Sequence, residues 1–176
     1  MHSEEPNATS SVESGVSGDS FRDAMSHLAG GVVLVISQVD GRPWGLTVTS
    51  CCAISPEPPL VAVSVQTRTA TARSILEQGV FELALLSSHQ RTLANHGSAS
   101  GAKKFLDEAL LADEDEEGTH NFTEERQRSL VNLRCRLVQA IQVSDHHLIV
   151  AQVDAVEKGT ETSPLVYWLR QYRMVG

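Results

Sequence analysis

Residues 31–66 read GVVLVISQVDGRPWGLTVTSCCAISPEPPLVAVSVQ, and this stretch decides the fold class. Val32 to Val39 is a nearly continuous run of β-branched and other apolar residues, and Asp40 to Pro43 contains the residue types that form turns. The chain then runs back from Trp44 to Cys52, which predicts a hairpin. A proline-rich break follows, and small or polar residues then alternate with valines over Leu60 to Gln66. The stretch therefore predicts successive antiparallel strands.

Short helices and further strands are expected on either side of this stretch. Three helices are expected: one capped by Asp19 or Ser20 and ended by Gly30-Gly31, a second over Thr71–Glu77 and a third over Ser88–Ala94. The further expected strands are Val80–Leu86, Leu133–Leu137, His146–Val156 after a turn near Ser144-Asp145, and Leu165–Leu169. Roughly seven strands joined by short helices predict a mainly β fold, an antiparallel Greek-key β-barrel with short peripheral helices, rather than a parallel βαβ sheet.

Length and composition predict one domain and exclude several classes of partner. A chain of 176 residues buries one core comfortably, and we expect residues 1–19, rich in Ser, Glu and Gly, to be a disordered tail before a domain over 20–176. The net charge is −8 and the basic residues are scattered, so we expect no nucleic-acid partner. We find no secretion signal and no segment apolar enough to span a membrane. Three cysteines, an odd number, favour a reducing cytoplasm.

The usual sequence-visible sites for nucleotides, hydrolysis and zinc are absent. The chain contains no Gly-x-Gly-x-x-Gly, no Walker loop, no Gly-x-Ser-x-Gly and no His-Glu-x-x-His. The adjacent His146 and His147 should point to opposite faces of a strand, so they are poorly placed to share a metal ion, and we predict no metal site. We interpret the acidic run Asp113–Glu117 as a solvated loop or helix end.

The segment Gly45 to Ser50 is the candidate binding element. Its small residues would let a flat ligand lie against the backbone, whose N–H and C=O groups could bind the polar edge of a ring. Thr47, Thr49 and Ser50 offer hydroxyl groups to a ribityl chain or a phosphate. Threonine is also simply a good strand former, so the residues alone leave both interpretations open.

Four motifs between Phe21 and Leu60 occur together and in order. They are Phe21-Arg22-Asp23-Ala24-Met25, Gly31-Val32-Val33-Leu34-Val35, Gly45-Leu46-Thr47-Val48-Thr49-Ser50 and Ile54-Ser55-Pro56-Glu57-Pro58-Pro59-Leu60. In this order and spacing they resemble the flavin reductase-like family. Further similarities are Thr69-Ala70-Thr71, Lys104-Phe105, Asp145-His146, Pro164-Leu165-Val166-Tyr167 and Tyr172-Arg173.

This resemblance implies a split-barrel FMN-binding fold, a homodimer, and an NAD(P)H:flavin oxidoreductase. NADH or NADPH would reduce FMN or FAD, and the reduced flavin would pass to a partner flavin-dependent monooxygenase. The implied cofactor-binding residues are Leu46, Thr47, Val48, Thr49 and Ser50 at the ring and ribityl chain, Ser64, Val65 and Gln66 closing over them, and Thr69, Thr71 and Lys104 at the phosphate; His146 and Tyr172 are implied on the nicotinamide side. No catalytic acid is expected, because the cofactors carry out the hydride chemistry.

The chain departs from the family pattern at several positions. Cys51-Cys52 replaces a bulky residue followed by Thr or Ser, and Ser144 replaces the Gly of a Gly-Asp-His turn. Residues 124–129 stand in place of the usual Gly-x-Pro-x-Leu. These changes concern the nicotinamide and substrate side. Three alternatives stay open for the chain as a whole: a flavin-binding electron-transfer protein, an oxidoreductase that retains its flavin and acts directly on an organic substrate, and a β-barrel interaction protein without a cofactor that docks through residues 113–117.

Overall fold

The computed structural model describes residues 15–109 and 122–175. In chain order the described elements are α1 (Gly18–Ser26), β1 (Gly30–Gly31), β2 (Val33–Val39), β3 (Arg42–Val48), β4 (Cys52–Pro56), β5 (Pro59–Gln66), α2 (Ala70–Gln78), β6 (Val80–Leu85), the 3-10 helix η1 (Ser88–Gln90), α3 (Arg91–Ser98), α4 (Leu106–Ala109), α5 (Phe122–Gln127), β7 (Val131–Val143), β8 (His146–Lys158), β9 (Leu165–Trp168) and β10 (Gln171–Met174). The acidic run 113–117 and residues 1–14 of the expected tail lie outside the described residues.

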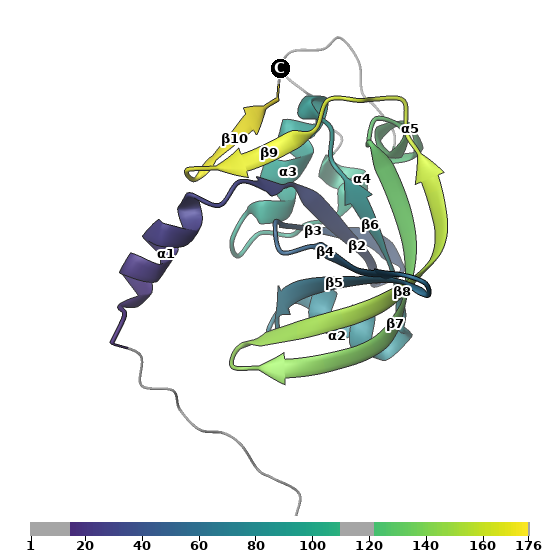
Figure 1. Ribbon diagram of the computed structural model, residues 1–176. Coiled ribbons are helices and arrows are strands. Elements are labelled where there is room, and N and C mark those ends of the chain that lie inside the picture. The colour runs from purple at the N-terminus through teal and green to yellow at the C-terminus, as the bar shows by residue number, and fades with distance from the viewer. Residues whose placement is uncertain (1–14, 110–121, 176) are drawn as a thin grey trace, which may run out of the picture.

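Two antiparallel sheets form the architecture (Figure 1). The larger sheet has seven strands in the order β3-β2-β6-β7-β8-β5-β4 and curls into a barrel, and the smaller has the order β1-β9-β10. This confirms the predicted mainly β, antiparallel barrel. The described strands exceed the expected number because β1, β4 and β10 are short and escaped the sequence patterns.

The predicted hairpin is present, with two corrections to its second strand. The turn consists of Asp40 and Gly41, both with positive φ (53° and 73°), so Arg42 already belongs to β3. That strand ends at Val48 instead of Cys52. After Val48 the chain leaves the β2 partner and crosses to β5, where Cys52 begins β4. Residues 49–51 thus connect two strands that lie at opposite edges of the large sheet.

Both faces of β2 are buried, which explains its continuous apolar sequence. Val35 faces the barrel interior, in a cluster with residues of β5, β6, β8 and α2. Leu34, its neighbour, points the other way into a second cluster with Leu86, Leu93 and Leu106, under α3 and α4. Burial of large aliphatic side chains on both faces stabilises this strand by roughly 2 kcal/mol per side chain. The strand therefore holds α3 rigidly against the outside of the barrel.

The first helix is built differently from the rest of the molecule. We expected Asp19 or Ser20 as its cap, but the cap is Ser17, whose side chain accepts a hydrogen bond from the backbone N–H of Ser20. The helix also ends earlier than expected, at Ser26. None of its residues is buried, and it projects from the barrel in Figure 1. Exposed apolar side chains are Phe21 and Met25 on the helix and Leu28 just after it.

Candidate functional site

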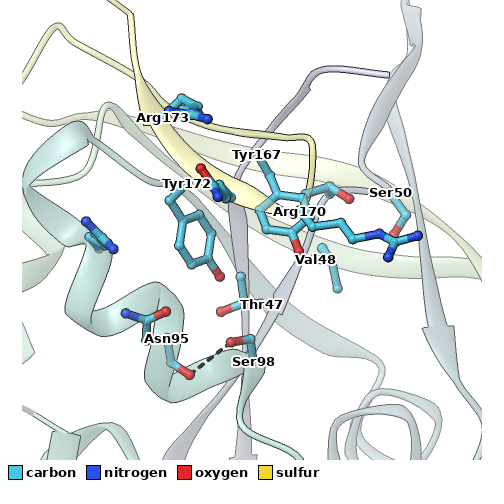
Figure 2. Close-up of a pocket in the computed structure, with 12 residues that line it drawn as sticks. Thr47, Val48, Ser50, Asn95, Ser98, Tyr167, Arg170, Tyr172 and Arg173 are labelled. Carbon is cyan, nitrogen blue, oxygen red and sulfur yellow. Dashed lines mark hydrogen bonds between the residues drawn. The ribbon is translucent and has the colours of Figure 1, made fainter. Parts of the chain in front are cut away.

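A cavity of about 870 Å³ lies where the end of β3, helix α3 and the β9–β10 hairpin meet (Figure 2). Apart from Val48, the lining residues are polar, basic or aromatic. The lining consists of Thr47, Val48, Thr49 and Ser50 from β3 and the segment after it, Arg91, Asn95 and Ser98 from α3, and Tyr167, Arg170, Gln171, Tyr172 and Arg173 from the hairpin. Three separate segments of the chain therefore form one cavity.

Two hydroxyl groups hold the walls of the cavity together. Thr47 Oγ1 donates to the Ala94 carbonyl oxygen at 2.8 Å, and the Tyr172 hydroxyl donates to the same oxygen at 3.3 Å. Burial raises the pKa of the Tyr172 hydroxyl, so the group stays protonated and can keep donating. The Tyr167 ring packs against Tyr172 edge to face, with ring centroids 5.3 Å apart. Strand β3, helix α3 and strand β10 are thereby tied together around the cavity.

The crossing segment 49–51 presents backbone groups that the sheet does not use. None of its N–H groups donates to another backbone group in the described part of the chain. The Ser50 hydroxyl donates to the Ser64 carbonyl oxygen at 2.9 Å and accepts from the Ser64 N–H at 3.2 Å, which fixes the segment in place. Thr49 and Ser50 are exposed and Cys51 is partly buried, so these N–H groups are accessible to the polar edge of a ligand.

Charge distinguishes the cavity from the rest of the chain. The full sequence carries a net charge of −8, yet Arg91, Arg170 and Arg173 line the cavity, and no Asp or Glu does so among the described residues. Arg170 has a loose, exposed ion pair with Asp23, with a nitrogen–oxygen distance of 3.8 Å. Guanidinium groups bind phosphate well. Together with the tyrosines and free N–H groups, they fit an anionic ligand with a flat ring, such as a flavin nucleotide.

The structure brings five of the predicted site residues together at this cavity: Thr47, Val48, Thr49, Ser50 and Tyr172. Ser64 adjoins it through its two hydrogen bonds to Ser50. Leu46 and Val65 instead face the barrel core, where Val65 is buried and Leu46 packs against the cluster. These last two side chains contribute to packing.

The predicted residues His146, Gln66 and Thr69 lie at a second location, the end of β5 and the β7–β8 turn. Gln66 is paired with His146 across the strands, and Thr69 caps α2 by accepting from the Ala72 N–H at 3.1 Å. His146 Nδ1 lies 2.8 Å from Asp145 Oδ1, and this hydrogen bond holds the pKa of the Asp145 carboxyl below its usual value. None of the three predicted residues lines the cavity.

Thr71 and Lys104 occupy structural positions. Thr71 is fully buried, and its hydroxyl has no hydrogen-bond partner among the described residues. Lys104 Nζ donates to the Gly97 carbonyl oxygen at 2.7 Å, beneath α3, and desolvation lowers the pKa of its ammonium group. Neither side chain reaches the cavity lining. Their assignment to a phosphate stays a prediction.

Several lining residues were not among the predicted site residues. They are Arg91, Asn95, Ser98, Tyr167, Arg170, Gln171 and Arg173. The motif around Tyr167 and Tyr172 already marked the hairpin, so a basic residue beside those tyrosines could have been considered. Arg91 begins a helix and gave no comparable signal.

In the described chain there is no group of three or more His, Cys, Asp or Glu side chains suited to a metal. No described helix is long and apolar enough to cross a membrane.

Comparisons with known proteins agree with this geometry. Residues 25–176 match the family described as flavin reductase like domain. The reductase component of 4-hydroxyphenylacetate 3-monooxygenase from Thermus thermophilus is 31% identical over 155 residues, which cover 88% of this chain and 95% of that protein. A flavin reductase (NADH) from Kitasatospora aureofaciens is 29% identical, covering 89% of this chain and 81% of that protein.

A solved structure supports the same conclusion. BorF, the flavin reductase component of a bacterial two-component tryptophan halogenase, superimposes with a TM-score of 0.74 at 25% identity, covering 90% of this chain and 98% of that one. The resemblance that the sequence motifs indicated is thereby confirmed. The chain belongs to the flavin reductase-like family.

Proposed function

We propose that this protein is an NAD(P)H-dependent flavin reductase that binds FMN or FAD at the cavity between β3, α3 and the β9–β10 hairpin. The observation that carries the proposal is the charge of this cavity, which three arginines and no described carboxylate line. The free N–H groups of segment 49–51 add donors for a polar ring edge. When bound, the flavin supplies the chemistry, because it accepts hydride from the nicotinamide.

The residues of the chain would act by binding and orienting. The backbone of 49–51 would hold the polar edge of the ring, and the arginines would neutralise phosphate. Tyr167 and Tyr172 would restrict the space so that the flavin ring and the nicotinamide ring stack face to face. His146 remains our candidate for the nicotinamide side, on the β7–β8 turn.

We also propose that the protein is a homodimer. The outer face of the large sheet, on the side away from the barrel core, has exposed apolar side chains at Ile141, Val143 and Leu148, and Ser64 lies opposite Leu148 on the neighbouring strand. A second copy on this face would lie next to the cavity, because Ser64 bonds Ser50. Light scattering after gel filtration should give twice the chain mass, and Leu148→Asp should give the monomer.

The recipient of reduced flavin is proposed to be a flavin-dependent monooxygenase. The support is that relatives at this similarity are reductase components of 4-hydroxyphenylacetate and 4-nitrophenol monooxygenases. A cytoplasmic location is likewise a proposal, supported by three free cysteines.

One experiment tests the activity. NADH and NADPH oxidation is followed by nicotinamide absorbance with purified protein and separately added FMN, FAD or riboflavin. Rapid oxidation that saturates with added flavin is expected. Tight flavin binding without NAD(P)H oxidation would refute the reductase proposal and favour the electron-transfer or direct-substrate alternative. A protein that binds no flavin would refute both.

A further inference from the structure

The turn between β9 and β10 has an unusual backbone. It consists of two residues, Leu169 and Arg170, because Trp168 pairs with Gln171 on either side. Both have positive φ, 47° and 60°, which is the left-handed region that favours glycine. Two-residue hairpin turns require such angles, and Asn-Gly or a similar pair normally supplies them. Nothing in the hairpin geometry itself therefore calls for an arginine at position 170.

The first helix holds this turn in place. The Leu169 N–H donates to the Ser26 carbonyl oxygen at 2.9 Å, and Trp168 Nε1 donates to the His27 carbonyl oxygen at 3.2 Å. These two bonds come from the backbone of Leu169 and from the indole of Trp168, so neither uses the Arg170 side chain. Both hydrogen bonds would remain whichever side chain occupies position 170.

The Arg170 side chain lies at the cavity. It is one of the lining residues, and Figure 2 shows it extending over Val48 toward Ser50, with Arg173 above Tyr172 in this view. The ion pair with Asp23 is weak by geometry, since its atoms are 3.8 Å apart and its side chains are 62% and 74% exposed. Arg170 therefore has a backbone conformation that favours glycine, and its side chain lies at a cavity that no described carboxylate lines. This combination suits the binding of an anion.

We infer that Arg170 is a specificity-determining residue that binds a phosphate group of a cofactor at the mouth of the cavity. The inference rests on the proposed function and deepens it, since it assigns one side chain of the cavity to a phosphate group of a cofactor. A guanidinium can donate two parallel hydrogen bonds to phosphate oxygens. The phosphate belongs either to the flavin or to the nicotinamide dinucleotide, and the experiment below distinguishes these two sources.

The test compares the wild type with Arg170→Gly and Asp23→Asn. Glycine accepts a φ of 60° without strain, so this variant removes the guanidinium and keeps the turn. Dissociation constants for FMN and riboflavin are measured by flavin fluorescence, which needs no turnover. We expect Arg170→Gly to weaken FMN binding about tenfold more than riboflavin binding. The KM for NADH is also measured, with riboflavin as the acceptor. If Arg170→Gly raises this KM but leaves the ratio of the FMN and riboflavin dissociation constants unchanged, the phosphate is assigned to the nicotinamide dinucleotide.

The control variant separates this role from a structural one. Asp23→Asn removes the ion pair with α1 but leaves Arg170, so FMN binding and activity should stay at the wild-type level. The Tm of Arg170→Gly should equal or exceed that of the wild type, because strain is relieved. The inference would be overturned if both variants had a lower Tm while the ratio of the FMN and riboflavin dissociation constants and the KM for NADH stayed unchanged. A wild type that binds FMN and riboflavin equally, together with an Arg170→Gly variant whose KM for NADH is unchanged, would also overturn it. Selective FMN binding without NADH oxidation would refute only the reductase activity.

Discussion

Gly97 is the position where a single added methyl group should disturb both the fold and the cavity. It lies on α3 where the helix crosses β3, and a Cβ there would overlap Thr47 Oγ1 and lie 2.8 Å from Leu34 Cδ1. Overpacking of this kind costs about 1–3 kcal/mol, and losing the Thr47 bond to Ala94 costs about 1 kcal/mol more. Alanine recovers roughly 1 kcal/mol of helix propensity. Gly97→Ala should therefore destabilise the fold by about 2 kcal/mol.

The assay is thermal unfolding together with flavin titration. For a chain of this size about 2 kcal/mol corresponds to a Tm lower by roughly 4–8 °C. Flavin affinity should also fall, because the displaced Thr47 lines the cavity. Gly31→Ala is the matched control, since a Cβ at Gly31 meets no atom within 4 Å. A Gly97→Ala protein with wild-type Tm and flavin affinity would show that α3 does not pack on β3 as described.

Three further predictions concern other parts of the molecule. Gly159→Ala should leave little folded protein in a solubility and circular dichroism comparison, because its Cβ would overlap a backbone carbonyl oxygen that cannot move away cheaply. Burial raises the pKa of Cys135 to about 12, so this thiol should resist a disulfide reagent that labels the exposed Cys52 at pH 8. The contribution of the protonated Cys135 thiol to the stability of the fold should be complete below pH 9 and lost as the pH rises from 9 toward 12. His146→Ala should mainly raise the KM for NADH while Ser50→Ala mainly weakens flavin binding, and equal effects of both changes on both constants would contradict these assignments.

The strands could be predicted because their patterns are local. β2 is apolar on consecutive residues since both of its faces are buried, and β7 and β8 alternate since they flank one core. The end of β3 could not be predicted in the same way. Thr49, Ser50 and Cys51 have ordinary strand propensities, and only the pairing of Cys52 with Ala62 on β5 shows that the chain has changed partners. That change depends on tertiary contacts, which override local propensity.

The helix α1 shows a different limit. The spacing of its apolar residues predicted a helix correctly. Phe21 and Met25 on this helix are nevertheless 59% and 45% exposed. The pattern of a sequence indicates which face of a helix is apolar, and it does not indicate whether the same chain covers that face.

The cavity itself illustrates why charge has to be considered locally. A net charge of −8 concealed a cationic site, because the three arginines are separated by up to 82 positions in the sequence, from Arg91 to Arg173. They meet only because β9 pairs with β1 and β10 pairs with β9, which places the hairpin across α3. At physiological salt the Debye length is about 8 Å, so distant carboxylates are screened while guanidiniums in contact with a ligand are screened less. An acidic chain can therefore bind anionic cofactors at one cavity, provided that its fold gathers cations there.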